Sequence, residues 1–321
     1  MHMNILANDG ISQSGVDKLE ANNFKVFQTK VAQEQLANFI NNNNIEVILV
    51  RSATKVRKEL IDQCPNLKII GRGGVGLDNI DVDYAKSKDI KVINTPAASS
   101  ESVAELVIGH ALSCLRFLKD ANRAMPLEGD QNFKALKKNY AGGLELKGKT
   151  MGIVGFGRIG QTVAEKAIGL GMNVMAFDKF IEEASIKIDF FDGQSLDFNI
   201  KTSSFEELLK SSDVITLHVP SQNDYILGKA EFKQMKPTSG IINTARGGVI
   251  DEVALVEALN NSTIAFAALD VFEKEPTPEI ALLMQDKLSL SPHIGGATIE
   301  AQSRIGEELA EQIIEIYNSK K

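Results

Sequence analysis

The sequence predicts an α/β protein that is built from two doubly wound, Rossmann-like domains. Short apolar runs alternate with helical patterns along the 321 residues, which is typical of parallel sheets covered by helices. The runs form two series, and each series has its own glycine-rich turn. Hydrophobic residues make up 43% and charged residues 24% of the chain, so a chain of this length can bury the cores of two domains.

The predicted elements follow one another in a regular order. The first series of strands lies at residues 5–7, 25–27, 47–50, 67–70 and 90–93. A helical pattern at 99–118 comes next; it opens with capping serines and acids and is long enough to join two domains. The second series lies at residues 151–154, 174–177, 214–217, 240–243, 267–270 and 288–290. An amphipathic pattern at 298–317 predicts a final helix.

The turn at residues 155–160 predicts a dinucleotide site. It follows a strand, opens a helix and is followed by a second strand that ends at Asp178. In such a turn Gly155 allows the tight bend, Gly157 lets the backbone approach a pyrophosphate, and Gly160 lets the helix pack on the sheet. Asp178 can accept hydrogen bonds from both ribose hydroxyls, and its charge would repel a 2′-phosphate, so NAD is favoured over NADP.

A second glycine turn, at residues 71–76, has the same spacing and also follows an apolar run. The strand after it ends in Asn94 rather than in an acid, and the residues between do not start a clean helix. Context therefore assigns the dinucleotide to residues 155–160. The earlier turn needs a different role.

Charge and cysteine content narrow the possible partners and compartment. A net charge of −7 and a pI near 5.3 argue against nucleic acid and against attraction to acidic membrane surfaces. Cys64 and Cys114 lack metal-ligand spacing, which favours reduced thiols and no metal site. The start of the chain does not resemble a signal peptide, and no apolar run reaches the length of a membrane span. We therefore expect a cytoplasmic protein.

Three clusters follow predicted strands in the second series, at residues 243–248, 270–276 and 291–296. The carboxyl ends of parallel strands are where ligands bind in open α/β sheets. Arg246 is a natural bidentate clamp for a carboxylate. His293 is a natural proton acceptor, and a carboxylate partner would hold its tautomer. Taken singly, each side chain could instead be a surface or structural group.

Together these motifs resemble the D-isomer-specific 2-hydroxyacid dehydrogenases over nearly the whole chain. The matching segments are residues 155–160, 218–220, 243–247, 270–276 and 292–296. The resemblance implies a discontinuous substrate-binding domain, formed by residues 1–98 and 294–321. It also implies an inserted NAD-binding Rossmann domain at residues 99–293, with an active site in the cleft. Hydride would pass between C2 of the hydroxy acid and the nicotinamide.

The resemblance also assigns roles to single residues. Arg246 would bind the substrate carboxylate and its carbonyl or hydroxyl, His293 would be the general acid/base, and Glu275 would pair with His293. The residues that would bind NAD are Gly155, Gly157, Arg158, Ile159, Gly160, Asp178, His218, Pro220, Thr244, Ala245, Arg246, Asp270, His293 and Gly295. The residues that would bind substrate are Arg51, Ser52, Arg72, Gly73, Gly74, Val75, Gly76, Asn94, Arg246 and His293. Residues 73–76 would offer backbone N–H groups to the substrate carboxylate.

Within the family, the N-terminal half most resembles the D-3-phosphoglycerate dehydrogenases of serine biosynthesis. The matching segments are residues 50–56, 71–81 and 94–105. This subgroup implies a phosphorylated hydroxy or keto acid as substrate, with Arg51 and Arg72 as the phosphate ligands. The alternative is that Arg51 forms a salt bridge with an acid at a domain edge and that Arg72 is solvated. Because the sequence ends soon after Tyr317, we expect no serine feedback through a C-terminal regulatory domain.

The family resemblance further implies a homodimer built around the helix that contains His110, although a buried core role for His110 fits equally well. The charge run with Lys134, Lys137 and Lys138 is either a further cation source or a solvated face.

A glyoxylate or hydroxypyruvate reductase would share the clamp and the Glu275–His293 pair but would lack the phosphate-binding cations. An NAD-binding corepressor is the alternative from a different class. Formate dehydrogenases pair their histidine with an amide, which excludes them here.

Overall fold

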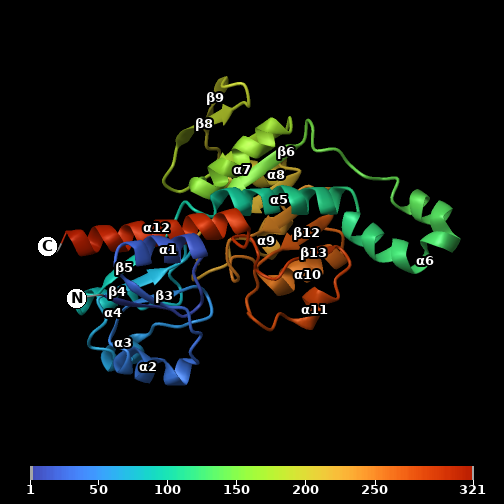
Figure 1. Cartoon of the computed structure of the whole chain (residues 1–321). Coiled ribbons are helices and arrows are strands. Elements are labelled where there is room, and N and C mark those ends of the chain that lie inside the picture. Colours follow the sequence, from blue (N-terminus) through green and yellow to red (C-terminus); the bar gives the residue numbers. More distant parts are fainter. Residues whose placement is uncertain (1–2, 320–321) are drawn as a thin grey trace. The chain divides into compact units, whose positions relative to one another are not determined.

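The computed structural model describes residues 3–319 and confirms the predicted α/β class (Figure 1). The chain forms two compact units. Unit 1 comprises the residues up to Ser102 together with those from Gly296 onward, and unit 2 comprises Val103–Gly295. No helix among the described residues combines the length and the apolar character needed to cross a membrane.

Unit 1 contains a five-stranded parallel sheet with the strand order β2-β1-β3-β4-β5. The order reverses between β1 and β3, which makes their carboxyl ends the expected ligand-binding edge. The strands are β1 (Asn4–Ala7), β2 (Lys25–Phe27), β3 (Ile45–Val50), β4 (Ile69–Arg72) and β5 (Lys91–Asn94). The helical segments are α1 (Gln13–Ala21), η1 (Gln33–Gln35), α2 (Leu36–Asn42), α3 (Lys58–Gln63), α4 (Val82–Ser87) and α12 (Ile299–Asn318).

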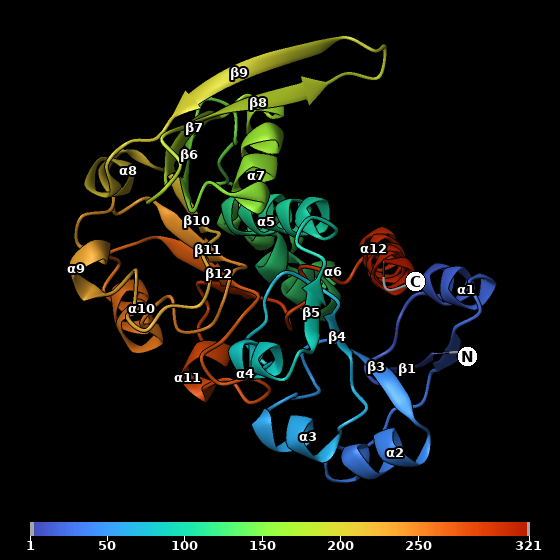
Figure 2. The same cartoon turned by 90° about the vertical axis from the view of Figure 1, so that its left-hand side faces the viewer.

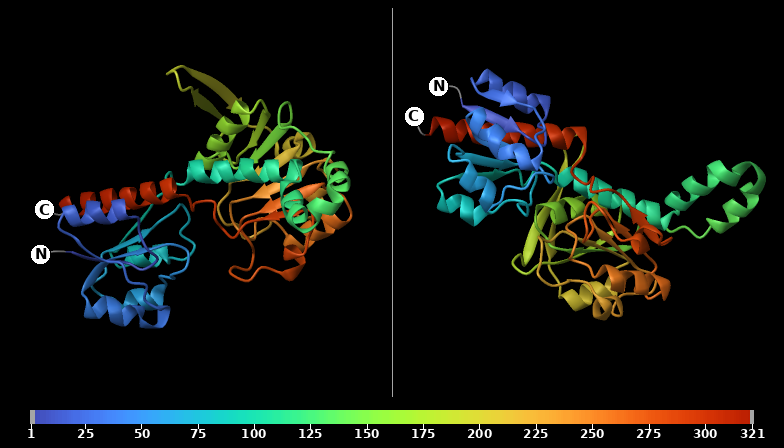
Figure 3. Two further views of the ribbon diagram at one scale, coloured as in Figure 1. Left: turned by 45° about the vertical axis from the view of Figure 1, so that its right-hand side comes forward. Right: turned by 90° about the horizontal axis from the view of Figure 1, so that it is seen from below.

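The last helix of the chain belongs to the first unit. Helix α12 packs beside α1, as the views of Figure 3 show. The two helices approach closely at Gly15 and Gly306, where a Cβ on Gly15 would lie 2.7 Å from the Gly306 carbonyl carbon. Ile305, Leu309 and Ile313 of α12 fill the core on this side of the sheet. Apolar burial therefore fixes the C-terminal helix to unit 1.

Unit 2 contains a six-stranded parallel sheet with the strand order β13-β12-β11-β10-β6-β7. Its strands are β6 (Thr150–Val154), β7 (Asn173–Phe177), β10 (Val214–Leu217), β11 (Gly240–Asn243), β12 (Phe266–Leu269) and β13 (Leu288–Leu290). Strands β10, β11 and β12 are buried along their whole length because apolar clusters cover both faces of the sheet. The order reverses between β6 and β10.

Unit 2 also contains seven helices within the described residues, most of which pack on this sheet. They are α5 (Ser100–Leu115), which begins in unit 1, α6 (Leu118–Asn139), α7 (Arg158–Gly169), α8 (Phe205–Ser211), α9 (Lys229–Phe232), α10 (Glu252–Asn260) and α11 (Ile280–Leu283). Helix α6 has non-helical backbone at Asn132 and extends away from the sheet (Figure 3). An antiparallel hairpin of β8 (Glu183–Asp189) and β9 (Ser195–Lys201) also projects from this unit (Figure 2).

Candidate active site and nucleotide site

A hollow of about 600 Å³ lies at the point of unit 2 where the strand order reverses. Its walls come from the ends of β6, β7 and β10, which is where a doubly wound sheet binds its nucleotide. Asp178, His218 and Pro220, which were predicted to bind the cofactor, line this hollow together with Gly155 and Gly157.

The backbone of the turn at residues 155–160 explains its glycines. Gly155 has a φ of +92°, and a Cβ there would collide with the His218 carbonyl oxygen. A Cβ on Gly160 would collide with the Gly155 carbonyl oxygen, because helix α7 begins tightly against the turn. A Cβ on Gly157 would meet nothing within 4 Å, which leaves room for a phosphate near the start of α7.

Asp178 holds the turn as well as facing the hollow. One carboxylate oxygen accepts the Phe156 N–H at 2.7 Å, and the other accepts the N–H groups of Phe180 at 2.8 Å and Ile181 at 3.1 Å. A carboxylate has about four acceptor positions, so about one remains for a ligand. Asp178 therefore serves the turn and faces the hollow at the same time, and its pairing with the ribose hydroxyls stays a prediction.

Two buried polar atoms near the predicted cofactor residues have no hydrogen-bond partner among the described residues. They are Nδ1 of His218 and Oγ1 of Thr244. Burial lowers the pKa of His218 from 6.5 to about 3, so its imidazole is neutral, and Nε2 lies 3.0 Å from Thr216 Oγ1. Buried polar atoms are normally hydrogen-bonded, so these two fit residues that receive a polar ligand. The turn, Asp178 and these atoms together fit a dinucleotide.

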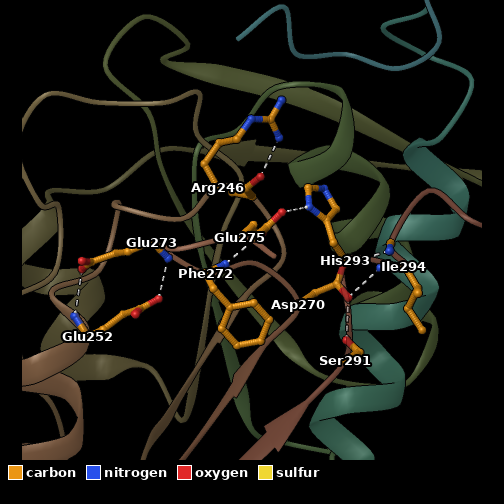
Figure 4. A network of polar contacts seen from close by, with 11 residues as sticks. Arg246, Glu252, Asp270, Phe272, Glu273, Glu275, Ser291, His293 and Ile294 are labelled. Carbon is orange, nitrogen blue, oxygen red and sulfur yellow. Dashed lines mark hydrogen bonds and ion pairs between the residues drawn. The ribbon is translucent and has the colours of Figure 1, made fainter. Parts of the chain in front are cut away.

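Glu275 and His293 form a hydrogen-bonded pair. Nδ1 of His293 lies 2.8 Å from Oε2 of Glu275 (Figure 4). The His293 side chain is 41% exposed and the Glu275 side chain is 35% exposed. The other Glu275 oxygen accepts the Phe272 N–H at 3.1 Å, which fixes the carboxylate. No residue between 3 and 319 hydrogen-bonds to Nε2 of His293. Nδ1–H therefore donates to the carboxylate, and Nε2 is the nitrogen that can exchange a proton with a ligand.

Asp270 fixes the backbone beside His293. Its carboxylate accepts the N–H groups of Ile294 at 2.9 Å and Gly295 at 2.8 Å, and the Ser291 hydroxyl donates to it at 2.6 Å (Figure 4). His293 itself has a φ of +55°, an uncommon conformation for a residue with a side chain. The surrounding hydrogen bonds therefore hold His293 in a backbone conformation that it would not adopt unaided.

The loop that carries Arg246 lies against the loop that carries Glu275. A Cβ on Gly247 would collide with the Phe272 carbonyl oxygen, so glycine is required for this approach. Asn243 shapes the loop from within, because its side chain accepts the Ala245 N–H at 3.0 Å and donates to the Arg246 carbonyl at 2.9 Å. The Arg246 guanidinium donates to the Ala245 carbonyl at 2.6 Å.

Two glutamates brace the start of the Glu275 loop. The Glu273 N–H donates to the Glu252 carboxylate at 2.8 Å, and the Glu252 N–H donates to the Glu273 carboxylate at 3.3 Å (Figure 4). Burial raises the pKa of Glu252. The sequence placed Asn243 and Glu273 in the clusters at residues 243–248 and 270–276 but gave no role to them or to Glu252, because each acts on backbone rather than on a ligand.

Unit 1 has its own hollow, of about 390 Å³, where its strand order reverses between β1 and β3. Arg51 and Ser52 line it, as do Asp9 and Lys30. The Asp9 carboxylate accepts hydrogen bonds from the Arg51 N–H at 2.7 Å, the Thr54 N–H at 3.1 Å and the Thr54 hydroxyl at 2.7 Å. Within residues 3–319, neither Arg51 nor Lys30 has an acidic ion-pair partner. The alternative in which Arg51 forms a salt bridge is therefore not what the structure contains.

Lys30 was missed at the sequence level. It stands three residues after β2, the shortest strand of unit 1, so the rule that ligands bind at carboxyl ends of strands would have identified it. Arg72 differs from its prediction. It is the last residue of β4 rather than part of the glycine loop, its guanidinium lies under Gly74, and it does not line the hollow with Arg51.

The turn at residues 73–76 has fewer open N–H groups than the sequence suggested. Gly73 N–H donates to the Val50 carbonyl at 2.9 Å, and Gly74 N–H donates to Thr95 Oγ1 at 2.8 Å. Among the described residues, the N–H groups of Val75 and Gly76 have no acceptor. The Asn94 side chain donates to the Val75 carbonyl at 2.8 Å and so holds the turn. Anion capture by this turn is therefore limited to Val75 and Gly76.

Within the described residues, no group of three or more His, Cys, Asp or Glu side chains is arranged to bind a metal.

Comparison with known proteins agrees with this geometry. Residues 108–295 match the family model described as D-isomer specific 2-hydroxyacid dehydrogenase, NAD binding domain. A hydroxypyruvate reductase of Thermotoga maritima is 46% identical over 274 residues, covering 84% of both chains. A D-3-phosphoglycerate dehydrogenase of Archaeoglobus fulgidus is 40% identical over 316 residues, covering 97% of this chain but 57% of that enzyme. The crystal structure of a Thermus thermophilus protein superposes with a TM-score of 0.82 at 28% identity, covering 99% of this chain and 97% of the other.

Proposed function

The chain belongs to the D-isomer-specific 2-hydroxyacid dehydrogenase family, and we propose that it interconverts 3-phosphoglycerate and 3-phosphohydroxypyruvate with NAD. The observation that carries the substrate assignment is the hollow of unit 1, which combines Arg51 and Lys30 with Asp9, a carboxylate that accepts three hydrogen bonds from Arg51 and Thr54. Two cations without acidic partners suit a phosphate group. In this proposal unit 1 binds the substrate phosphate and unit 2 binds the cofactor.

The chemistry in the proposal comes from three side chains of unit 2. Arg246 binds the substrate carboxylate, and His293 exchanges a proton with the substrate oxygen through Nε2. Glu275, 2.8 Å from Nδ1, holds the imidazole in the required tautomer and balances the positive charge it gains. NAD, when bound, supplies hydride exchange at the nicotinamide ring. The turn at residues 155–160, Asp178, His218 and Thr244 are the residues that would hold it.

Hydroxypyruvate reduction is the second candidate, because the Thermotoga maritima relative of that name is 46% identical to this chain. Both activities use the same acid/base pair, so only the phosphate site separates them. A charge-assisted contact contributes about 1.5–3 kcal/mol, and we take the lower end because Lys30 is exposed and Arg51 is half-buried. Two such contacts favour the phosphorylated substrate by roughly 10² in kcat/KM.

The test compares Arg51→Met and Lys30→Met with a matched control, Lys86→Met, which removes an exposed lysine of unit 1 that does not line the hollow. We expect each of the first two changes to lower kcat/KM for phosphohydroxypyruvate by roughly tenfold or more. The rate with hydroxypyruvate should stay nearly constant, and the control should change neither. Equal losses on both substrates, or no loss, would reject the phosphate site.

A further inference from the structure

We propose that His110 is a positioning residue, which orients the loop carrying His293 through Ser291 and Asp270. The proposal rests on the proposed acid/base role of His293. His110 lies on α5 and is only 6% exposed, and sequence reasoning left its role open between a buried core residue and a dimer contact. Its ring joins two serines, with Nδ1 3.0 Å from Ser289 Oγ and Nε2 2.9 Å from Ser291 Oγ.

The direction of each hydrogen bond follows from the number of protons available. The Asp270 carboxylate can only accept, so the single hydroxyl proton of Ser291 is donated to it, at 2.6 Å. Ser291 therefore has no proton left for His110, and Nε2–H of His110 must donate to Ser291 Oγ. In the neutral ring Nδ1 is then an acceptor, and the Ser289 hydroxyl donates to it.

The imidazole has the environment that this arrangement requires. Burial lowers the pKa of His110, an effect that the negative charge of Asp270 partly offsets, so the ring is neutral near pH 7. Ser289 and Ser291 are two residues apart, within β13 and just after its end, so both hydroxyls face the same side. A single ring can therefore bridge them.

The chain of hydrogen bonds ends at the backbone beside His293. Asp270 accepts the N–H groups of Ile294 and Gly295, at 2.9 and 2.8 Å, directly after His293 with its φ of +55°. The Ser291 hydroxyl orients the Asp270 oxygen that also accepts Ile294 N–H. Loss of His110 would leave the Ser291 hydroxyl free to rotate away, and the carboxylate would hold the loop less firmly.

The experiment compares His110→Leu, which keeps an apolar volume but loses both ring nitrogens, with His110→Gln, whose amide can both accept and donate. Ser113→Ala, one turn further along α5, is the matched control. Two measurements are made on each protein: steady-state kinetics with a 2-keto acid and NADH, and hydrogen–deuterium exchange of the amides of Ile294 and Gly295. The melting temperature is recorded for each.

We expect His110→Leu to lower kcat by roughly tenfold while KM for the keto acid stays within about threefold, and to accelerate exchange at Ile294 and Gly295. His110→Gln should recover most of both properties, and Ser113→Ala should match the wild type. Ser291→Ala should reproduce the leucine variant, and the double variant should lose no more, because both changes interrupt the same chain. Ser291→Ala also serves if the leucine variant does not fold.

Unchanged exchange at Ile294 and Gly295 in folded His110→Leu or Ser291→Ala would overturn the inference, as would a glutamine variant no better than leucine. A merely structural role predicts a lower melting temperature with unchanged kcat below it. If the wild type reduces no 2-keto acid, the proposed function fails, whereas the exchange measurement still decides whether His110 positions the loop.

Discussion

Asp178 provides the sharpest quantitative prediction about cofactor choice, because the structure gives its carboxylate two roles. Three backbone N–H groups, including that of Phe156 in the glycine turn, occupy most of its acceptor positions. The remaining position suits one ribose hydroxyl, a contact of about 1.5–3 kcal/mol. A 2′-phosphate about 5 Å from the carboxylate would instead lose about 1–3 kcal/mol per charge at a half-buried site. NADH should therefore bind more tightly than NADPH by about 2 kcal/mol or more, which is roughly thirtyfold.

The decisive perturbation is Asp178→Ala, with dissociation constants for NADH and NADPH measured by fluorescence titration. Loss of the turn's acceptor should weaken the binding of both cofactors. Loss of the ribose contact should further weaken NADH, and loss of the charge should favour NADPH, so only these two effects change the ratio of the dissociation constants. We expect the ratio to fall to within about fivefold. Lys179→Met should raise the NADH preference, because Lys179 lines the same hollow and would attract a 2′-phosphate. Asp192→Ala removes an acid of the hairpin turn outside the hollow and is the control.

Two results would refute this reasoning. Equal affinity of the wild type for both cofactors would show that Asp178 does not select between them. An unchanged ratio in Asp178→Ala, with both affinities reduced, would show that the carboxylate only supports the turn.

Two further predictions concern the histidines of unit 2. Glu275→Gln should lower kcat by roughly tenfold with NADH affinity unchanged, because a neutral amide balances the charge of a protonated imidazole less well than a carboxylate does. His293→Ala should lower kcat by about 10²–10⁴. Wild-type rates in either variant would contradict the acid/base pair. His218, with a pKa lowered to about 3, should make folding acid-sensitive, because between pH 6.5 and about 3 the unfolded chain binds a proton that the folded chain does not. The contribution of His218 to stability is complete above pH 6.5 and falls by up to about 1.4 kcal/mol per pH unit below that pH. The free energy of unfolding, measured by denaturant titration, should therefore drop less between about pH 6 and pH 4 in His218→Gln than in the wild type. An equal drop in both proteins would contradict the lowered pKa of His218.

The central strands of both sheets could be predicted because they are apolar and buried. Residues 214–217 and 240–243, for example, were predicted as strands and form β10 and β11, both fully buried. Helix bounds were also close, since the segment at 298–317 is α12, Ile299–Asn318, capped by the Thr298 side chain. Local patterns suffice wherever one face, or both faces, of an element meets a core.

The β8–β9 hairpin was not predicted because its strands are mostly exposed and lack the continuous apolar runs that mark the buried strands. Two local signals were present: residues 183–189 and 195–201 both alternate between polar and apolar side chains, and Asp192-Gly193 occupies the turn, where Gly193 has a φ of +85°. Helix α6 was missed for a similar reason. Most of its described side chains are exposed or half-buried, whereas Leu136 is buried.

The candidate site was predictable in its residue types but not in its geometry. Arg246, Glu275 and His293 each follow a strand, so their position at one edge of the sheet follows from parallel pairing. The sequence could not show that the N–H groups of Gly73 and Gly74 already have acceptors within the protein, because these acceptors, Val50 and Thr95, lie more than about 20 residues away along the chain. The separation of Arg72 from the hollow of Arg51 likewise depends on side-chain packing under Gly74.

We propose that this enzyme acts on a phosphorylated three-carbon acid, and one set of initial rates distinguishes this substrate from the unphosphorylated acids. The wild-type protein is assayed with NADH and, in turn, phosphohydroxypyruvate, hydroxypyruvate, glyoxylate and 2-oxoglutarate. The cations Arg51 and Lys30 predict that kcat/KM for phosphohydroxypyruvate exceeds that for hydroxypyruvate by roughly 10². Turnover of hydroxypyruvate or glyoxylate with equal or higher kcat/KM would contradict the claim and identify the protein as a reductase of the unphosphorylated acids.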